Sequence, residues 1–439
     1  MKSARSIAIN TLLKVDRDGA YSNIAIDKML ENSELSSKDK ALATSIVYGV
    51  LERKITLQHI IAKYSKTPLK KLKPFILICL ETALYQILFM DKIPDSAAVN
   101  ETVKIVRKSK FQALGGFVNA VLRSFLRDDK KIEYPTKQVE YLSVKYSVSK
   151  DIAKLFVNQY EKSAEDILSG FFALDGVSIK VNTLKISASN LKEELSKQCE
   201  VSAHPLIDDV LIVKGAGSVR NLYGFKEGYF HVQDAASAIC AKIVGAIGGE
   251  RVLDVCAAPG GKSFSIAENM GDSGEVLSLD LYEHKVELIK KGAERLGLNS
   301  IKAIVNDAEK YNANLGKFNK VLCDLPCSGI GILGKKPEIR YKNVAFIDNL
   351  PSLQYHLLCT SATYVEKDGL LFYSTCSLNK NENIEVVKRF LAENDDFMPY
   401  EIGKEFEKHS DDFDNTLTLF PHIHKTDGFF ISAFKRVGE

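Results

Sequence analysis

Two cysteines of this chain stand in short polar motifs where a thiol can react. Cys327 lies within Asp324-Leu-Pro-Cys-Ser-Gly329, and Cys376 lies within Ser374-Thr-Cys-Ser377. The thiolate is the nucleophilic form of cysteine, and a polar, partly exposed setting favours it. A cysteine inside an apolar segment, such as Cys323, is instead typical of a buried core thiol. Cys327 and Cys376 are therefore the candidates for covalent chemistry.

The segment 252–262 predicts a cofactor site at the end of a strand. Its first residues are apolar, the turn that follows is Cys-Ala-Ala-Pro-Gly-Gly, and a helix is expected to begin near Gly261 or Lys262. Small residues let a ligand approach the backbone, and a helix N-terminus presents free N–H groups and the positive end of the helix dipole. The segment matches neither the phosphate loop GxxxxGKS/T nor the dinucleotide motif GxGxxG. A cofactor without a pyrophosphate therefore fits better.

Carboxylates follow the next two predicted strands as well. Asp280 ends the second strand, and Asp307 follows the third. In open α/β sheets a ligand lies across the carboxyl ends of neighbouring strands, where an acid can accept both hydroxyls of a ribose. Asp280 has the position for this contact, and Asp307 can reach the base. With Asp254 at the end of the first strand, three acids in register favour ligand binding over three helix caps.

Thiols beside an activated methyl group suit methylation of cytosine. Carbon 5 of cytosine is a poor nucleophile, but a thiolate that adds to carbon 6 converts the ring into an enamine, and carbon 5 can then attack an electrophilic methyl group. A base must afterwards remove the proton from carbon 5 so that the thiol can leave. This chemistry requires a thiolate, a nearby acid or base and a sulfonium cofactor. Because the ends of parallel strands share one edge, we expect Cys327 and Cys376 to converge there.

The surrounding pattern predicts a multidomain chain. Residues 1–135 indicate an all-α domain, because Gly and Pro are sparse and apolar residues recur at helical spacing. Residues 136–230 mix helical and strand-like segments and predict a small α+β domain. In residues 231–439 apolar strand-like segments alternate with helical ones, which is typical of an α/β Rossmann-like domain with a doubly wound parallel sheet.

Composition excludes several classes of protein. The chain has 439 residues, of which 45% are hydrophobic and 26% charged, so it is neither disordered throughout nor fibrous. No segment reaches the ~18 apolar residues of a membrane span. The N-terminus lacks the apolar core of an export signal, and no two cysteines form a CxxC pair. We therefore expect a cytoplasmic monomer with reduced thiols, no membrane association and no metal, since the pair His422 and His424 has no evident third ligand.

Charge is unevenly distributed. Residues 1–135 hold 23 Lys and Arg against 14 Asp and Glu, a net charge of +9, whereas the whole chain carries +3. A basic surface of this kind indicates a polyanion partner. Phosphate contacts would make the affinity for RNA depend strongly on salt. The basic residues that we expect to contact phosphates are Lys70, Lys71, Lys73, Lys104, Arg107, Lys108 and Lys110.

Three motifs, in their order along the chain, resemble those of the NOL1/NOP2/Sun family of RNA 5-methylcytosine methyltransferases. They are the turn at 254–262 and the cysteine motifs at 324–329 and 374–377. Upstream, the segments 83–90, 94–101 and 116–123 resemble a NusB-type RNA-binding helical domain. The combination is similar to bacterial members of the family that methylate one cytosine of small-subunit (16S) ribosomal RNA. The resemblance covers essentially the whole chain, and it implies a NusB-like domain over 1–135 and a methyltransferase domain over 231–439.

The resemblance also implies a role for each motif residue. Cys376 would be the nucleophile, and Cys327 would help to release the methylated product. Asp324 would lie near the target base, and it stays open whether Asp324 or Cys327 removes the carbon 5 proton. Lys180 departs from the family, in which arginine is usual, and this difference concerns the expected RNA contacts. The residues implied for S-adenosylmethionine binding are Cys256, Ala257, Ala258, Pro259, Gly260, Gly261, Lys262, Asp280 at the ribose, Asp307 at the adenine, and Asp324 at the methionine end.

Three other functions are consistent with parts of this pattern. A DNA cytosine methyltransferase would place its nucleophile in the Pro-Cys motif, which here is Cys327. An enzyme of the same chemistry would act on tRNA or another RNA. An RNA-binding assembly or antitermination factor with a vestigial cofactor fold would bind RNA without binding S-adenosylmethionine. The intact turn at 254–262 and the two motif cysteines argue against the last of these.

Overall fold

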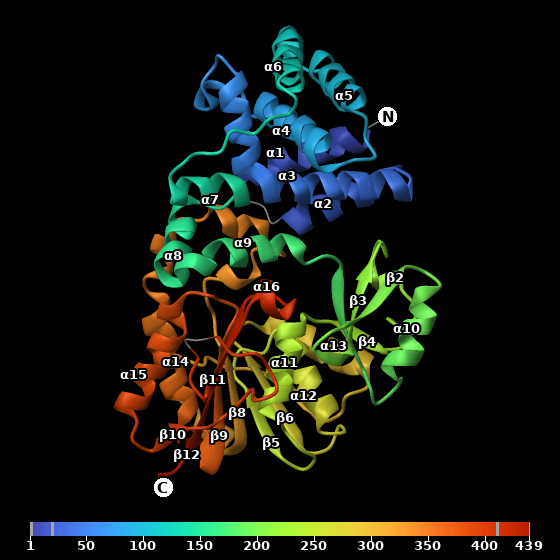
Figure 1. Cartoon of the computed structure of the whole chain (residues 1–439). Coiled ribbons are helices and arrows are strands. Elements are labelled where there is room, and N and C mark those ends of the chain that lie inside the picture. The colour runs from blue at the N-terminus through green and yellow to red at the C-terminus, as the bar shows by residue number, and fades with distance from the viewer. Residues whose placement is uncertain (1–2, 19–21, 410–411, 439) are drawn as a thin grey trace. The chain divides into compact units, whose positions relative to one another are not determined.

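The chain forms two compact units in a computed structural model that describes residues 3–18, 22–409 and 412–438 (Figure 1). The first unit comprises Met1–Glu161 together with Lys336–Asn343, and the second comprises Lys162–Lys335 and Val344–Glu439. The proposed division at 135/136 and 230/231 stays a prediction. Among the described residues, no helix is both long and apolar enough to cross a membrane.

The first unit is helical, as its apolar spacing predicts. Its central helix α4 is buried on nearly every side and includes the buried polar residues Glu81 and Gln86. The side chain of Ser36 caps the longest helix, α3, by accepting a hydrogen bond from the backbone N–H of Asp39. The α-helices are α1 (Ala4–Asp18), α2 (Ser22–Glu31), α3 (Ser37–Tyr64), α4 (Pro74–Phe89), α5 (Asp95–Arg107), α6 (Gly115–Arg127), α7 (Gln138–Tyr146) and α8 (Lys150–Tyr160).

A short segment from the second half of the sequence packs into this helical unit. It contains the 3-10 helix η7 (Pro337–Tyr341), and Arg340 within it is completely buried. The Arg340 guanidinium donates to the carbonyl of Tyr146 over 2.9 Å, and the Glu338 carboxylate accepts from the backbone N–H of Ser22 over 3.1 Å. Glu338 and Tyr341 also line a cavity of about 280 Å³ whose other walls come from α1, α3 and α4. The sequence pattern did not predict this insertion.

The second unit contains a small antiparallel sheet with strand order β2-β3-β1-β4. Leu191 and Leu195 of the covering helix α10 pack against the buried face of the sheet. The strands predicted near 177–181 and 210–213 are both present. The elements are helix α9 (Ala164–Ala173), strand β1 (Val177–Val181), helix α10 (Ala188–Ser196), and strands β2 (Glu200–His204), β3 (Ile207–Lys214) and β4 (Phe230–Val232).

The larger sheet has the order β10-β12-β9-β8-β5-β6-β7, with β11 paired to β12. The five strands from β9 to β7 are parallel, as the alternating pattern predicts, and β10, β11 and β12 add an antiparallel edge. The sheet is therefore mixed rather than wholly parallel. Its strands are β5 (Arg251–Asp254), β6 (Glu275–Asp280), β7 (Ile301–Val305), β8 (Phe318–Asp324), β9 (Val365–Thr375), β10 (Phe397–Pro399), β11 (Thr416–Leu419) and β12 (Phe429–Arg436).

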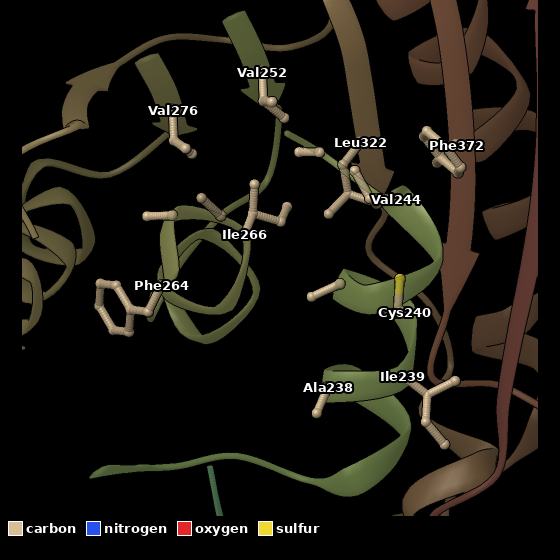
Figure 2. Packing of buried hydrophobic residues seen from close by; sticks show 14 of the residues in the cluster. Ala238, Ile239, Cys240, Val244, Val252, Phe264, Ile266, Val276, Leu322 and Phe372 are labelled. Carbon is tan, nitrogen blue, oxygen red and sulfur yellow. The ribbon is translucent and has the colours of Figure 1, made fainter. Parts of the chain in front are cut away.

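Helices cover this sheet and exclude water from its faces. In Figure 2, side chains of α11 and α12 meet Val252, Val276, Leu322 and Phe372 from four of the parallel strands. Burial of this apolar surface fixes α12, and therefore the turn before it, against the strands. The helices are α11 (Ala235–Val244), α12 (Gly261–Asn269), α13 (Glu283–Leu296), α14 (Leu350–Ala362), α15 (Ile384–Glu393) and α16 (Pro421–His424).

Candidate active site

The carboxyl ends of the parallel strands bring the predicted site residues to one edge of the sheet. Asp254 of β5 pairs with Ser278 of β6, two residues before Asp280. On the other side of β5, strand β8 reaches Asp324, which pairs with Ser374 of β9. The two cysteine motifs thus begin side by side, next to the strand that leads into the small-residue turn.

The turn between β5 and α12 is compact because its residues are small. Gly260 has a φ of +107°, and a Cβ there would lie 2.4 Å from the ring of Phe264, so glycine is required. The backbone N–H of Ala257 donates to the carbonyl of Leu279 over 2.8 Å, which ties the turn to β6. Helix α12 begins at Gly261, as predicted, and no side chain caps it. Its first N–H groups are the positive end of the helix dipole.

Lys262 and Asp324 form an ion pair at the centre of the edge. The Lys262 ammonium lies 2.6 Å from one Asp324 oxygen, and the Ser374 hydroxyl donates to the other oxygen over 2.9 Å. Lys262 also donates to the Ser237 hydroxyl over 3.3 Å. Burial opposes its charge, yet the pKa of Lys262 lies above the usual value because the Asp324 carboxylate faces it. Sequence reasoning missed Ser237, and it missed Ser374 as a partner of Asp324.

The three strand-end acids differ in their surroundings. Asp254 is fully buried and accepts from the Ser263 hydroxyl over 2.7 Å, and burial raises the pKa of its carboxyl to about 7. Asp280 is almost buried and accepts from the backbone N–H of Tyr282 over 3.2 Å. Asp307 is more exposed, and an ion pair of 2.9 Å with Lys310 lowers its pKa. The structure thus places Asp280 and Asp307 at successive strand ends without direct contact between them.

The two motif thiols converge, as the parallel arrangement predicts. The Cys327 and Cys376 sulfurs lie 3.2 Å apart, and both side chains are partly buried. The pKa of the Cys327 thiol is raised well above its usual value, first by the hydrogen bond to Cys376 and next by burial. These contacts therefore favour the protonated form of Cys327. Cys323 is buried in the core, as expected.

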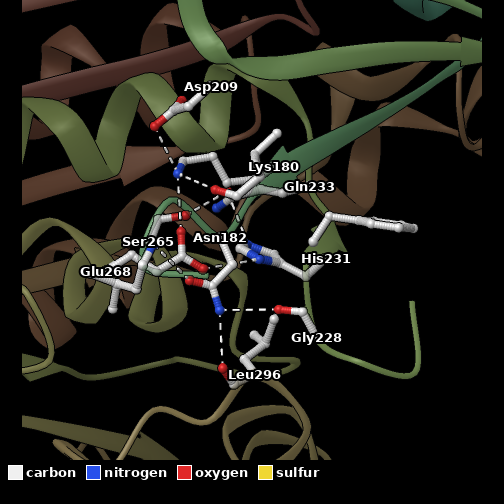
Figure 3. A network of polar contacts seen from close by, with 12 residues as sticks. Lys180, Asn182, Asp209, Gly228, His231, Gln233, Ser265, Glu268 and Leu296 are labelled. Atoms are coloured by element: carbon white, nitrogen blue, oxygen red, sulfur yellow. Dashed lines mark hydrogen bonds and ion pairs between the residues drawn. The ribbon is translucent and has the colours of Figure 1, made fainter. Parts of the chain in front are cut away.

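Buried polar side chains of the small sheet and of helix α12 form a network of hydrogen bonds and ion pairs (Figure 3). The Lys180 ammonium, only 2% exposed, lies 3.0 Å from Glu268 of α12 and 2.8 Å from Asp209. The His231 ring lies beside Glu268, and burial lowers the pKa of His231 to about 3, so it is neutral. Burial likewise raises the pKa of Glu268 to about 7. Lys180 is therefore part of the interior of this unit.

Of the histidine pair near the C-terminus, His424 has structural hydrogen-bond partners. His424 Nδ1 accepts from the backbone N–H of Phe420 over 2.9 Å, and its Nε2 faces the carbonyl of Glu407 at 2.8 Å. Across residues 3–18, 22–409 and 412–438, no group of three or more His, Cys, Asp or Glu side chains is arranged to hold a metal ion.

Comparison with known proteins gives matches along nearly the whole chain. The family of 16S rRNA methyltransferases RsmB/F matches residues 243–435, and the NusB family matches residues 2–127. A probable ribosomal RNA small subunit methyltransferase B from Bacillus subtilis (strain 168) is 35% identical over 449 residues, which cover 99% of each chain. The crystal structure of PH0851 has 25% sequence identity to this chain and a TM-score of 0.81. The match covers 99% of this chain and 98% of that chain. A methyltransferase homolog protein from Pyrococcus horikoshii, also 25% identical, has a TM-score of 0.61 over 69% of this chain and all of its own.

The mixed Rossmann-like sheet, the small-residue turn and the NusB-type helices define an RNA methyltransferase. More specifically, the chain belongs to the RsmB/F family of 16S rRNA methyltransferases. The resemblance drawn from the motifs is thereby confirmed. The matches leave the DNA methyltransferase interpretation without support.

Proposed function

We propose that this enzyme methylates carbon 5 of one cytosine in small-subunit (16S) ribosomal RNA, with S-adenosylmethionine as the methyl donor and a covalent adduct between Cys376 and carbon 6. The observation that carries the proposal is the Cys327–Cys376 contact of 3.2 Å next to the Lys262–Asp324 ion pair. Two thiols at the carboxyl edge of a methyltransferase sheet are the parts that addition and release at a cytosine ring require.

The residues along the sheet edge fit S-adenosylmethionine. Among the described residues, Asp254 Oδ1 and Asn306 Nδ2 are buried without a hydrogen-bond partner, and the N-terminus of α12 has no side-chain cap. Polar groups without partners at the ends of β5 and β7 support a polar ligand between them. Residues 256–262 would hold the methionine end together with Asp324, Asp280 the ribose, and Asp307 the adenine. When bound, S-adenosylmethionine supplies an electrophilic methyl group on a sulfonium.

The raised pKa of Cys327 supports Cys376 as the nucleophile. The hydrogen bond between the two sulfurs and burial both favour the protonated form of Cys327, and we therefore assign the attack to Cys376. The Cys376 thiolate adds to carbon 6, and after methylation a base takes the carbon 5 proton so that the sulfur–carbon bond breaks. Cys327 and Asp324 are the candidates for that base. A DNA-type arrangement would make Cys327 the nucleophile, and the raised pKa of Cys327 disfavours that role.

The helical unit presents a basic surface that we assign to RNA phosphates. Lys70, Lys71 and Lys73 are exposed before α4, and Arg107 and Lys108 are exposed at the end of α5. The rings of Phe75 and Phe111 stack at 5.6 Å and bring these two segments together. We retain the monomeric state and the cytoplasmic location as predictions.

The test is transfer of a labelled methyl group from S-adenosylmethionine to unmodified, protein-free small-subunit ribosomal RNA, followed by nucleoside analysis. Label in 5-methylcytidine at one position is the expected result. Label at another atom would overturn the cytosine assignment. Label found only with tRNA or large-subunit RNA would overturn the substrate, and RNA binding without cofactor binding would favour the vestigial assembly factor.

A further inference from the structure

A buried carboxylate lies behind the two cysteine motifs and contacts both. Glu382 ends a short 3-10 helix at 380–382 and is completely buried. Its Oε2 accepts from the backbone N–H of Ser328 over 2.7 Å and from Nε2 of Gln354 over 3.2 Å. Gln354 in turn donates to the carbonyl of Pro326 over 2.9 Å. One oxygen of Glu382 therefore fixes the loop that carries Cys327.

The second oxygen fixes the other loop. Glu382 Oε1 accepts from the Ser377 hydroxyl over 2.9 Å and from Nδ2 of Asn379 over 3.1 Å. Because Ser377 gives its proton to Glu382, the Ser328 hydroxyl donates to Ser377 across a gap of 2.9 Å. The two serines directly follow Cys327 and Cys376, so this bridge sets the separation of the loops one residue away from the thiols.

The charge of Glu382 also acts on the thiols. Beyond the hydrogen bond to Cys376 and burial, the Glu382 carboxylate contributes to the raised pKa of Cys327. A negative charge in a poorly solvated setting disfavours a second negative charge nearby. The same carboxylate thus both spaces the loops and favours a protonated Cys327. A buried carboxylate is costly unless it is fully hydrogen-bonded, and the four donors around Glu382 meet that need.

We propose that Glu382 is a positioning residue that holds the Cys327 and Cys376 loops in register, so that Cys376 is placed to attack and Cys327 lies beside it. The inference rests on the proposed cytosine chemistry. Glu382 itself is buried behind the thiols, so its effect passes through Ser328, Ser377 and the electrostatic field.

The first test compares Glu382→Gln with Glu385→Gln in the full-length enzyme. Glu385 lies three residues further along in an exposed pair with Lys388, so its variant removes a carboxylate without touching the bridge. In single-turnover methyl transfer, Glu382→Gln should lose on the order of tenfold or more in rate with unchanged KM for RNA, because misplaced reacting groups lower the rate of the chemical step. Glu385→Gln should match the wild type. Melting curves and calorimetric titration with S-adenosylmethionine check that both variants are folded.

The second test follows thiol chemistry without RNA. In a Cys376→Ala background, the pH profile of Cys327 alkylation by iodoacetamide is measured by peptide mass spectrometry with and without Glu382→Gln. Removing the negative charge should move the profile about one pH unit lower. A purely structural role would leave the profile in place. Glu382→Asp should keep the profile near that of the wild type but lose methyl transfer, since the shorter side chain keeps the charge and loses its reach.

Each outcome decides the inference. Wild-type rate together with an unshifted profile in a folded Glu382→Gln variant would overturn it. If Glu382→Gln does not fold, Ser377→Ala removes one donor of the bridge and should show a smaller loss in the same direction; no loss would overturn the role of the bridge. If the wild-type enzyme makes no 5-methylcytidine but the alkylation profile still shifts, the proposed function fails and the assignment of Glu382 to the thiol pair stands.

Discussion

At the scale of single residues, the site is defined by the difference between two equivalent-looking thiols. Cys327 and Cys376 touch each other, but hydrogen bonding, burial and the Glu382 carboxylate all act to keep Cys327 protonated. An asymmetric pair of this kind suits a reaction in which one sulfur attacks while the other remains available for proton transfer.

This asymmetry predicts opposite phenotypes for the two alanine variants. Cys376→Ala should lose methyl transfer by on the order of a thousandfold or more, because no nucleophile remains. Cys327→Ala should still attack the RNA but release it slowly, so that a protein–RNA adduct accumulates. Denaturing gel electrophoresis with labelled RNA measures the adduct.

A matched control is Cys199→Ser, which changes a partly buried thiol directly before strand β2 of the small sheet. Normal release by Cys327→Ala would instead assign the proton transfer to Asp324, and an adduct that persists in Cys376→Ala would identify Cys327 as the nucleophile.

At the scale of elements, helix α12 must be held in place at both ends. Its N-terminus follows the cofactor turn, and Glu268 near its C-terminus is bound by Lys180 from β1. Removing Lys180 leaves two carboxylates without their cation in a buried setting. Lys180→Met should therefore destabilise the second unit by about 3–5 kcal/mol, the usual range for breaking a buried pair.

Chemical denaturation of the Lys180→Met variant measures this loss, and a Glu268→Gln background should reduce it because the stranded charge is gone. The loss should also shrink as the pH falls through 7, since the raised pKa of Glu268 lets it accept a proton. A loss of the same size in both backgrounds would show that Lys180 acts through packing alone. Lys180→Arg should be tolerated if the guanidinium fits between the acids.

Helix α4 carries a comparable pH-dependent group in the first unit. Burial raises the pKa of Glu81 to about 7 from 4.5, although Gln58 donates to it over 2.8 Å. A carboxyl with a raised folded-state pKa contributes stability that is complete below about pH 4.5 and is lost as the pH rises through about 7. Glu81→Gln should therefore gain on the order of 3 kcal/mol relative to the wild type at pH 8, and little at pH 4.5.

The Glu81 prediction is measured as the difference in unfolding free energy between variant and wild type across this pH range. Glu101→Gln on α5 serves as the control, because Glu101 is in an exposed pair with Lys104. A pH-independent difference for Glu81→Gln would mean that the carboxyl has the same pKa in the folded and unfolded states, which would contradict the prediction.

These elements also show what the sequence pattern can and cannot predict. The parallel strands were evident because each is a short apolar run followed by a turn, and the convergence of Cys327 and Cys376 follows from parallel pairing alone. The antiparallel edge formed by β10, β11 and β12 was missed, because the alternation of strands and helices predicted a wholly parallel sheet. Glu382 lies in a polar segment, and such a segment predicts an exposed loop. Only the contacts with Ser328 and Ser377 show that Glu382 is buried.

At the scale of the whole molecule, the chain returns to its helical unit after leaving it. Arg340 and Glu338, encoded between β8 and α14, complete the walls of a unit otherwise formed by residues 1–161. The helical unit is therefore not formed by N-terminal residues alone, although the NusB family match covers only residues 2–127. A truncated protein that ends at Glu161 would lack the buried Arg340 guanidinium, and the cavity beside Glu81 would be exposed.

The basic surface of the same unit is where we expect RNA phosphates to bind. If Lys70, Lys71 and Lys73 each neutralise one phosphate, replacing all three by alanine should reduce the slope of log affinity against log salt by about two to three. Affinity should fall uniformly across RNA sequences while the methylated position stays the same, because phosphate contacts carry no sequence information. Binding titrations between low and physiological salt measure the slope.

The control for this experiment has the same change in charge at three exposed lysines on α1, α2 and α3, namely Lys14, Lys28 and Lys38. An equal change in slope for both triple variants would show that net charge alone governs binding, and a flat response of the wild-type enzyme to salt would remove the phosphate contacts altogether. A smaller slope for the first triple variant alone would locate the RNA path at the junction of α4 and α5. That result would also explain why the excess of positive charge is confined to the N-terminal third of a chain that is otherwise acidic, since residues 136–439 hold 36 basic against 42 acidic side chains.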